Sequence, residues 1–293
     1  MIESFLKYLK YEKRVSKHTL TAYQSDLEQY TTFLDEVFPD HTPEQADYGI
    51  IRSWIIRLVD SGIKPASVNR KIASLKTFYK FLMRQEVIAK NPMIKIRVLK
   101  AQKRLPSFVK EADMVNLLDH VEFDSSFEGW RDKLMLELFY ATGVRLSELI
   151  TLKESQIDTR AQTIKVLGKR NKERIIPFPK SIVKVLQEYL GYRNKEVDMK
   201  NHGLLFVTDK GKPCYPMMVY RIVRHYLNAT TSADKRSPHV LRHTYATHLL
   251  NKGAEINAVK DLLGHSSLAA TQVYMHNSME KIKKAYEQAH PKA

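Results

Sequence analysis

Cysteine is nearly absent from the chain. Cys214 is the only cysteine among 293 residues, which excludes an intramolecular disulfide framework and any metal site built from several cysteines. Long hydrophobic runs are also missing: no stretch approaches the roughly 20 apolar residues of a membrane-spanning helix, and no secretory leader opens the chain. We therefore expect a soluble, cytoplasmic protein.

Acidic residues are scarce between residues 51 and 110. This segment holds 15 Lys/Arg but only Asp60 and Glu86, a net charge of +13, whereas residues 1–50 hold 5 Lys/Arg and 9 Asp/Glu, a net of −4. The whole chain carries +16. A solvated surface usually mixes both signs, so a block of one sign indicates a polyanionic partner. Nucleic acid is favoured over a membrane surface, because no segment combines these cations with a strongly apolar insertion face.

The length predicts about two domains. Residues 1–92 have helical periodicity throughout and form the first predicted domain. In its last helix the predicted core residues are Ile72, Leu75, Tyr79 and Leu82. Asn91-Pro92 then breaks the helix, and residues 93–107 form a basic, extended linker. The candidate DNA-binding residues lie on this helix and the linker: Lys71, Lys76, Lys80, Arg84, Lys103 and Arg104.

The second predicted domain covers residues 108–293. It is mainly helical, but "QTIKVLGKRNKERIIPFP" predicts a β-hairpin with a basic tip. The fold class is therefore mainly α with a small antiparallel β-sheet. The tail "MEKIKKAYEQAHPKA" predicts a short helix whose narrow apolar stripe must dock on something to be stable.

One helix carries an unusual density of polar residues: "SPHVLRHTYATHLL", residues 237–250. Ser237 and Pro238 predict its N-cap and first turn, where free backbone N–H groups favour an anion. His239 and Arg242 would then face a phosphate. The alternatives are a metal site at His239 and His243, four residues apart, and a purely structural role, which we favour for His243 and His248.

Four further segments carry residues suited to phosphate chemistry. These are "ATGVRLSEL", "GKRNKER", "LLGHSS" and "TQVY". Together with "SPHVLRHTYATHLL", and in this order, they resemble the tyrosine recombinase (phage integrase) family, most of all its Xer site-specific recombinases. The first 92 residues are similar to that family's helical, SAM-like core-binding domain. The resemblance implies that the catalytic residues are Arg145, Lys169, His239, Arg242, His265 and Tyr274, with Tyr274 as nucleophile.

These residue types suit phosphodiester transfer without a cofactor or metal. The two arginines would neutralise the non-bridging oxygens, and Tyr274 would attack phosphorus. Lys169 is the candidate general acid for the leaving oxygen, although it lies among Arg170, Lys172 and Arg174, which could form an ordinary solvated run of charge. His239 would accept the tyrosine proton, and His265 would hydrogen-bond the phosphate.

The resemblance also implies the partners. They are double-stranded DNA with two inverted half-sites, a homotetramer or a heterotetramer with a second recombinase, an FtsK-like DNA translocase as activator, and no membrane. The expected function is site-specific recombination through a 3′-phosphotyrosine, resolving chromosome dimers at a dif-like site. The alternatives are an integrase or transposase of a mobile element and a catalytically inactive DNA-binding relative.

Overall fold

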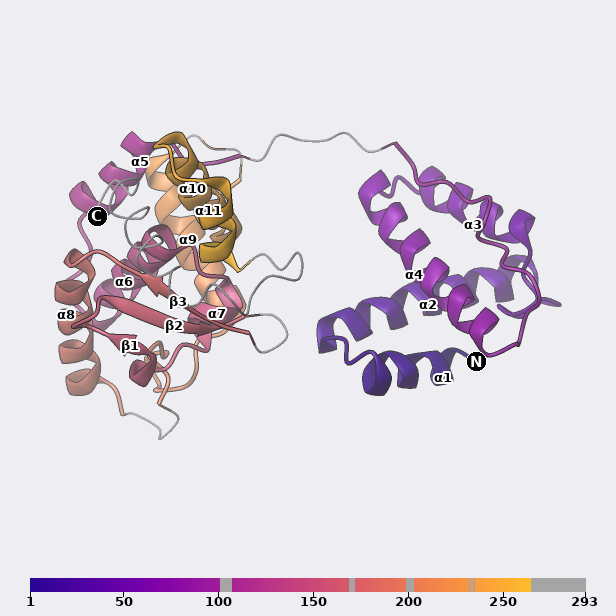
Figure 1. The fold of residues 1–293 in the computed structure, drawn as a ribbon, viewed down its shortest axis with the longest axis horizontal. Coiled ribbons are helices and arrows are strands. Elements are labelled where there is room, and N and C mark those ends of the chain that lie inside the picture. The colour runs from indigo at the N-terminus through magenta and orange to yellow at the C-terminus, as the bar shows by residue number, and fades with distance from the viewer. Residues whose placement is uncertain (101–106, 169–171, 199–202, 232, 234, 265–293) are drawn as a thin grey trace. The chain divides into compact units, whose positions relative to one another are not determined.

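The computed structural model describes residues 1–293 except 101–106, 169–171, 199–202, 232, 234 and 265–293. The chain divides into two compact units, Met1–Arg104 and Leu105–Ala293 (Figure 1). Each unit buries its own hydrophobic cluster. Within the described ranges, no helix is both long and apolar enough to cross a membrane.

The first unit is entirely helical. Two of its helices begin at side-chain caps, since Ser16 accepts a hydrogen bond from the Thr19 amide and Asp47 accepts one from the Ile50 amide. The elements are α1 (Ile2–Lys7), a π-helical turn (Tyr8–Glu12), α2 (Lys17–Val37), α3 (Tyr48–Asp60) and α4 (Pro65–Arg84).

The predicted core face of α4 is confirmed. Ile72, Leu75, Tyr79 and Leu82 are all fully buried. The Tyr79 hydroxyl lies 3.1 Å from that of Tyr30 on α2, so the aromatic core keeps its polar atoms paired.

The segment after α4 differs from the predicted linker, which begins at residue 93. Met93 and Ile96 are buried in the first unit. The Asn69 side chain pairs with both backbone groups of Leu99, at 2.9 and 2.7 Å. Lys76 donates to the Ile96 carbonyl at 2.9 Å. These contacts place residues 93–99 with the helical unit, because every third side chain there is buried or half-buried: Met93, Ile96 and Leu99.

The second unit combines helices with one small sheet, which confirms the predicted fold class. Its helices are α5 (Glu111–Val115), a π-helical turn (Asn116–His120), α6 (Phe127–Thr142), α7 (Leu146–Ile150), a 3₁₀ turn (Glu154–Gln156), α8 (Ser181–Glu196), α9 (Pro216–Thr230), α10 (Pro238–Asn251) and α11 (Ile256–Leu263).

The sheet contains the predicted hairpin and one unpredicted short strand. β2 (Thr163–Leu167) pairs antiparallel with β3 (Glu173–Pro177), and β1 (Ile157–Asp158) lies on the other side of β2. In this register Ile164 faces Ile176, and both are fully buried. Val166 faces Arg174, which directs the Arg174 side chain to the same inner face because side chains alternate along a strand.

Candidate active site

A tight turn between α6 and α7 positions Arg145. α6 ends at Gly143, whose φ of 59° is the left-handed conformation that glycine adopts at little cost. A Cβ atom on Gly143 would lie 2.4 Å from Cδ1 of Tyr245, so packing also requires glycine. Two residues later Arg145 is the N-cap of α7, and its side chain is 28% exposed.

Arg242 projects from the buried side of α10. It is 8% exposed and donates to the carbonyls of Gly143 and Leu263. Burial, together with the charges of Arg145 and Arg174, lowers the pKa of Arg242 to about 10. The group therefore remains a cation at neutral pH, held in an environment that favours an anionic ligand.

Three arginines converge on the C-terminal end of α11. Arg174 donates to the Leu262 carbonyl at 2.9 Å, Arg242 to that of Leu263, and Arg145 to that of Gly264 at 3.1 Å. These last helical carbonyls lack intrahelical partners and carry the negative end of the helix dipole, so cations bind them favourably. In Figure 1, α10, α11, α7 and β3 accordingly lie in one region of the second unit.

A buried carboxylate, Glu148, organises two of these arginines. Its side chain is 4% exposed and accepts from the backbone and guanidinium of Arg145, both at 2.8 Å, and from Arg174 at 2.8 and 2.7 Å. Burial alone would raise the pKa of Glu148, but these hydrogen bonds and charges lower it. Three guanidiniums and one carboxylate leave the cluster with a net charge of +2, which suits a phosphate diester.

Sequence reasoning missed Glu148 and misjudged Arg174. The signal for Glu148 was its position three residues after Arg145, where a capping-box residue reaches back to the N-cap. Arg174 does not belong to a solvated run of charge, because its side chain is 12% exposed and fully engaged. Lys172, two residues earlier, is exposed as that interpretation expects.

The histidines of α10 occupy different environments. Ser237 is the N-cap and Pro238 the first residue, as predicted, and His239 is exposed in the first turn. His243 is half-buried. His248 is buried, and its Nδ1 lies 3.1 Å from the Tyr140 hydroxyl, as expected of a structural residue. Burial lowers the pKa of His248, so it is neutral at pH 7.

Five of the predicted site residues lie outside the described residues. They are Lys169, His265, Tyr274, Lys103 and Arg104. Two of them directly follow described residues in the sequence. Lys169 belongs to the short connection between β2 and β3, and His265 directly follows Gly264, whose carbonyl binds Arg145.

The candidate DNA-binding residues of the first unit are not equally accessible. Lys80 and Arg84 are exposed, and Lys76 is half-buried. Lys71, in contrast, is 5% exposed, and its ammonium is bound to Asp26 at 3.0 Å and to Gln29 at 2.6 Å. The expectation that Lys71 presents a free cation is therefore wrong.

Arg70 occupies the surface position beside Lys71. Its side chain is 50% exposed, and its two Nη atoms bind the carboxylate of the fully buried Asp26. Asp26 thus fixes one exposed and one buried cation of α4 against α2.

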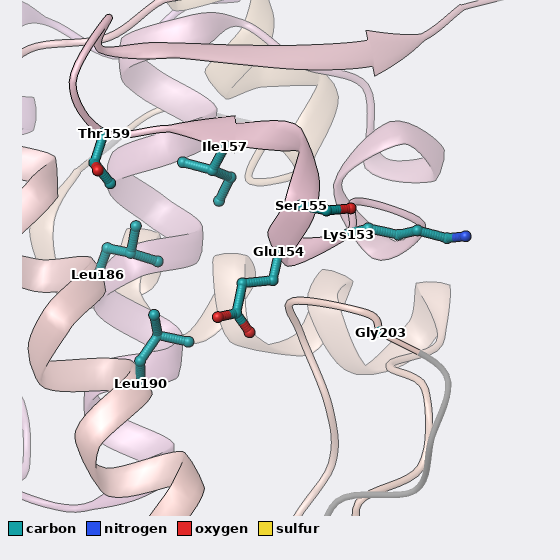
Figure 2. A pocket seen from close by; sticks show the side chains of 8 residues that line it. All are labelled: Lys153, Glu154, Ser155, Ile157, Thr159, Leu186, Leu190 and Gly203. Atoms are coloured by element: carbon teal, nitrogen blue, oxygen red, sulfur yellow. The ribbon is translucent and has the colours of Figure 1, made fainter.

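A separate pocket of about 700 Å³ lies beside α8 (Figure 2). Its apolar wall is Ile157, Leu186 and Leu190, and Lys153 points away from that wall. Glu154 also lines it, but this carboxylate is paired with Arg193 at 2.7 Å. The arginine cluster contributes none of the lining residues, so the pocket is distinct from the candidate active site.

Family models match both units. The phage integrase family matches residues 107–281, and the phage integrase N-terminal SAM-like domain matches residues 2–86. The protein named tyrosine recombinase XerC from Chlorobaculum parvum is 36% identical over 317 residues, covering 100% of this chain and 94% of that protein. The protein of the same name from Staphylococcus epidermidis is 40% identical over 293 residues, covering 99% and 97%.

Solved structures share the fold. The XerH site-specific recombinase bound to palindromic difH substrate, in a post-cleavage complex, aligns with a TM-score of 0.73 at 21% identity. The alignment covers 97% of this chain and 82% of that one. The Tn1549 transposon integrase in complex with transposon right end DNA also aligns with a TM-score of 0.73, at 20% identity, covering 96% and 99%.

Proposed function

Because this chain belongs to the phage integrase family of tyrosine recombinases, enzymes that cleave and rejoin DNA, we propose that it recombines DNA at a dif-like chromosomal site. Site-specific recombination itself follows from the family and from relatives 36–40% identical over the full chain. The observation that best supports the cleavage chemistry is the pair Arg145 and Arg242, held together at the end of α11 in a cluster of net charge +2.

In the proposed reaction the two arginines bind the scissile phosphate. Their remaining N–H groups contact the non-bridging oxygens and stabilise the charge that builds up on them in the transition state. Arg145 is partly exposed and open to the DNA, whereas Arg242 contributes mainly through a buried positive charge.

Tyr274 attacks phosphorus and forms the 3′-phosphotyrosine bond, while the bond to the 5′ oxygen breaks. His239 takes the phenolic proton, a role that its exposure on the first turn of α10 permits. Lys169 gives a proton to the leaving 5′ oxygen. The 5′ hydroxyl of the partner strand then attacks the phosphotyrosine, which restores the diester and releases Tyr274.

The proposed assembly is a tetramer on two duplexes. Each chain occupies one of two inverted half-sites, with a second, related recombinase or another copy on the neighbouring half-site, and a DNA translocase activates the complex. The relatives named tyrosine recombinase XerC support DNA as the partner. The tetramer, the second recombinase and the translocase are what the resemblance to Xer recombinases implies.

A mobile-element integrase is the second candidate. It is supported by the fold shared with the Tn1549 integrase, but at 20% identity this likeness carries only the fold. An inactive DNA-binding relative is disfavoured, because Arg145, Arg242 and Tyr274 are all present in the sequence.

Selection of bound genomic fragments, followed by cleavage of the selected site, tests the proposal. We expect one chromosomal locus with two inverted half-sites. On a nicked suicide duplex of that site, the chain should form a covalent complex with the 3′ phosphate that survives denaturing electrophoresis. Selection of transposon ends would instead favour the mobile-element function, and binding without a covalent complex would favour the inactive relative.

A further inference from the structure

We propose that Arg174 is a positioning residue that holds the β2–β3 hairpin, and with it Lys169, in register with the two active-site arginines. The inference rests on the proposed function, since it concerns the proton that Lys169 gives to the leaving oxygen. Arg174 itself does not contact the phosphate.

Every nitrogen of the Arg174 guanidinium is already engaged. Nη1 and Nη2 donate to the two oxygens of Glu148 at 2.8 and 2.7 Å, and Nε donates to the Leu262 carbonyl at 2.9 Å. The side chain is 12% exposed, compared with 28% for Arg145. This geometry fixes Arg174 inside the protein, with all three guanidinium nitrogens bound to protein oxygens, and the more exposed Arg145 is the arginine of this ion-pair network that is open to substrate.

The side chain joins three parts of the active site that are far apart in sequence. Its backbone belongs to β3, Glu148 connects it to Arg145, and Leu262 connects it to the end of α11. The next carbonyl along, that of Leu263, binds Arg242. If Arg174 moved, the position of the hairpin relative to Arg145 and Arg242 would therefore change.

The base of the hairpin packs on the same ion pair. The Gly168 amide donates to the Lys172 carbonyl at 2.7 Å, next to the last pair of the two strands, Leu167 and Glu173. A Cβ atom on Gly168 would lie 3.4 Å from Nη1 of Arg174 and 3.9 Å from Oε1 of Glu148. Gly168, at the base of the hairpin, thus lies next to the Arg174–Glu148 pair.

Lysine cannot replace this arrangement. A guanidinium offers a planar fork for both carboxylate oxygens and a further Nε–H for the carbonyl, whereas an ammonium is a point charge on a flexible stem. Arg174→Lys keeps the charge but loses the fork, so the hairpin loses its fixed distance to Glu148. Displacing a reacting group by about 1 Å costs on the order of 10²-fold in rate.

The test compares two substrates that differ in their need for an acid. One is the selected duplex with its natural 5′ bridging oxygen, and the other carries sulfur there, which leaves without a proton. We expect Arg174→Lys to cleave the oxygen substrate about 10²-fold more slowly than the parent chain, and the sulfur-to-oxygen rate ratio to rise, as it should for Lys169→Ala. A purely structural or phosphate-binding defect slows both substrates equally and leaves the ratio unchanged.

Two more variants complete the design. Gly168→Ala would place its Cβ 3.1 Å from the Lys172 carbonyl oxygen, which is tighter than an ordinary contact, and would shift the base of the hairpin relative to the Arg174–Glu148 pair. This variant should also raise the ratio, so the inference remains testable if Arg174→Lys folds poorly. Lys165→Gln is the matched control, because it removes a cation from an exposed ion pair with Glu173 on the same hairpin, and its ratio should not change.

The outcomes separate the two proposals. A parent chain that cleaves neither substrate refutes the proposed function and this inference with it. A parent chain that cleaves, with a raised ratio in Lys169→Ala but an unchanged ratio in both Arg174→Lys and Gly168→Ala, refutes the inference alone.

Discussion

Glu148→Gln tests how far one buried carboxylate holds the active site together. The substitution keeps the shape of the side chain but removes its charge, and it turns one oxygen into an N–H donor that faces a guanidinium. Glu148 accepts four hydrogen bonds, three of them from guanidinium nitrogens. Removing one partner of a buried ion pair costs roughly 3–5 kcal/mol. The amide oxygen of glutamine keeps part of the interaction with the arginines. We therefore expect the free energy of unfolding of the second unit to fall by about 3 kcal/mol.

The two tryptophans allow the second unit to be observed alone. Trp54 lies in the core of the first unit and Trp130 in α6 of the second. In a Trp54→Phe background, urea unfolding followed by fluorescence reports on the second unit. This matters because a chain of two units is not expected to unfold in a single two-state step. Lys165→Gln is the control, because it breaks only the exposed Lys165–Glu173 pair. Its free energy of unfolding should stay within about 0.5 kcal/mol of that of the parent chain.

The destabilisation should also depend on pH. The folded-state pKa of Glu148 is lowered from its ordinary value of 4.5, so the unfolded chain takes up the proton first as the pH falls. The stability contributed by the charged form is complete above pH 4.5 and is lost as the pH falls through the folded-state pKa. The difference in free energy of unfolding between the parent chain and Glu148→Gln should therefore become smaller in acid. A gap below about 1 kcal/mol at neutral pH, or one that widens in acid, would refute this account of the cluster.

Three further outcomes follow from the sequence and the fold. Tyr274→Phe should bind the selected duplex normally but form no covalent complex on a denaturing gel. A covalent complex that persists in this variant would mean that another residue is the nucleophile. Replacing Lys76, Lys80 and Arg84 with alanine should weaken specific and non-specific DNA binding alike. The slope of log affinity against log salt concentration should become shallower by about 0.9 for each phosphate that is no longer neutralised. An unchanged slope would mean that these side chains of α4 do not contact DNA. The family resemblance implies that the tail after Tyr274 docks on the neighbouring protomer. A chain ending at Met279 should therefore still bind a half-site but lose cooperative occupation of the full site in a gel-shift titration, whereas equal cooperativity would mean that the tail packs on its own subunit.

Helical periodicity predicted the core of α4 but not the environment of its cations. Lys71 lies three residues after Val68 and four before Leu75, which places it in the buried stripe of the helix. A lysine in such a stripe needs a buried acid, and Asp26 supplies it from α2, 45 residues away. Sequence spacing identifies the stripe, but no local pattern identifies a partner at that separation.

The hairpin shows the same division between local and long-range information. Its pairing was predictable from two β-branched runs around a basic tip. The inward direction of Arg174 was also available, because it alternates in step with the buried Ile176. The basic run is interpreted as fully solvent-exposed only if the alternation of side chains along the strand is not considered. What strand alternation cannot provide is the carbonyl of Leu262, 88 residues away, that makes this position favourable for a cation.

The arginines of the site were recognisable from the sequence, but their arrangement at the end of α11 was not. Motif residues such as Arg145 and Arg242 mark the chemistry, but backbone carbonyls carry no side-chain identity and so leave no trace in the sequence. Here three consecutive carbonyls of one helix end bind three guanidiniums. The visible sign is Gly264, whose φ of 61° turns the chain out of the helix and directly precedes His265. In the proposed mechanism this helix end therefore has two connections: its carbonyls bind Arg145 and Arg242, and the chain that leaves it leads in sequence to His265 and Tyr274.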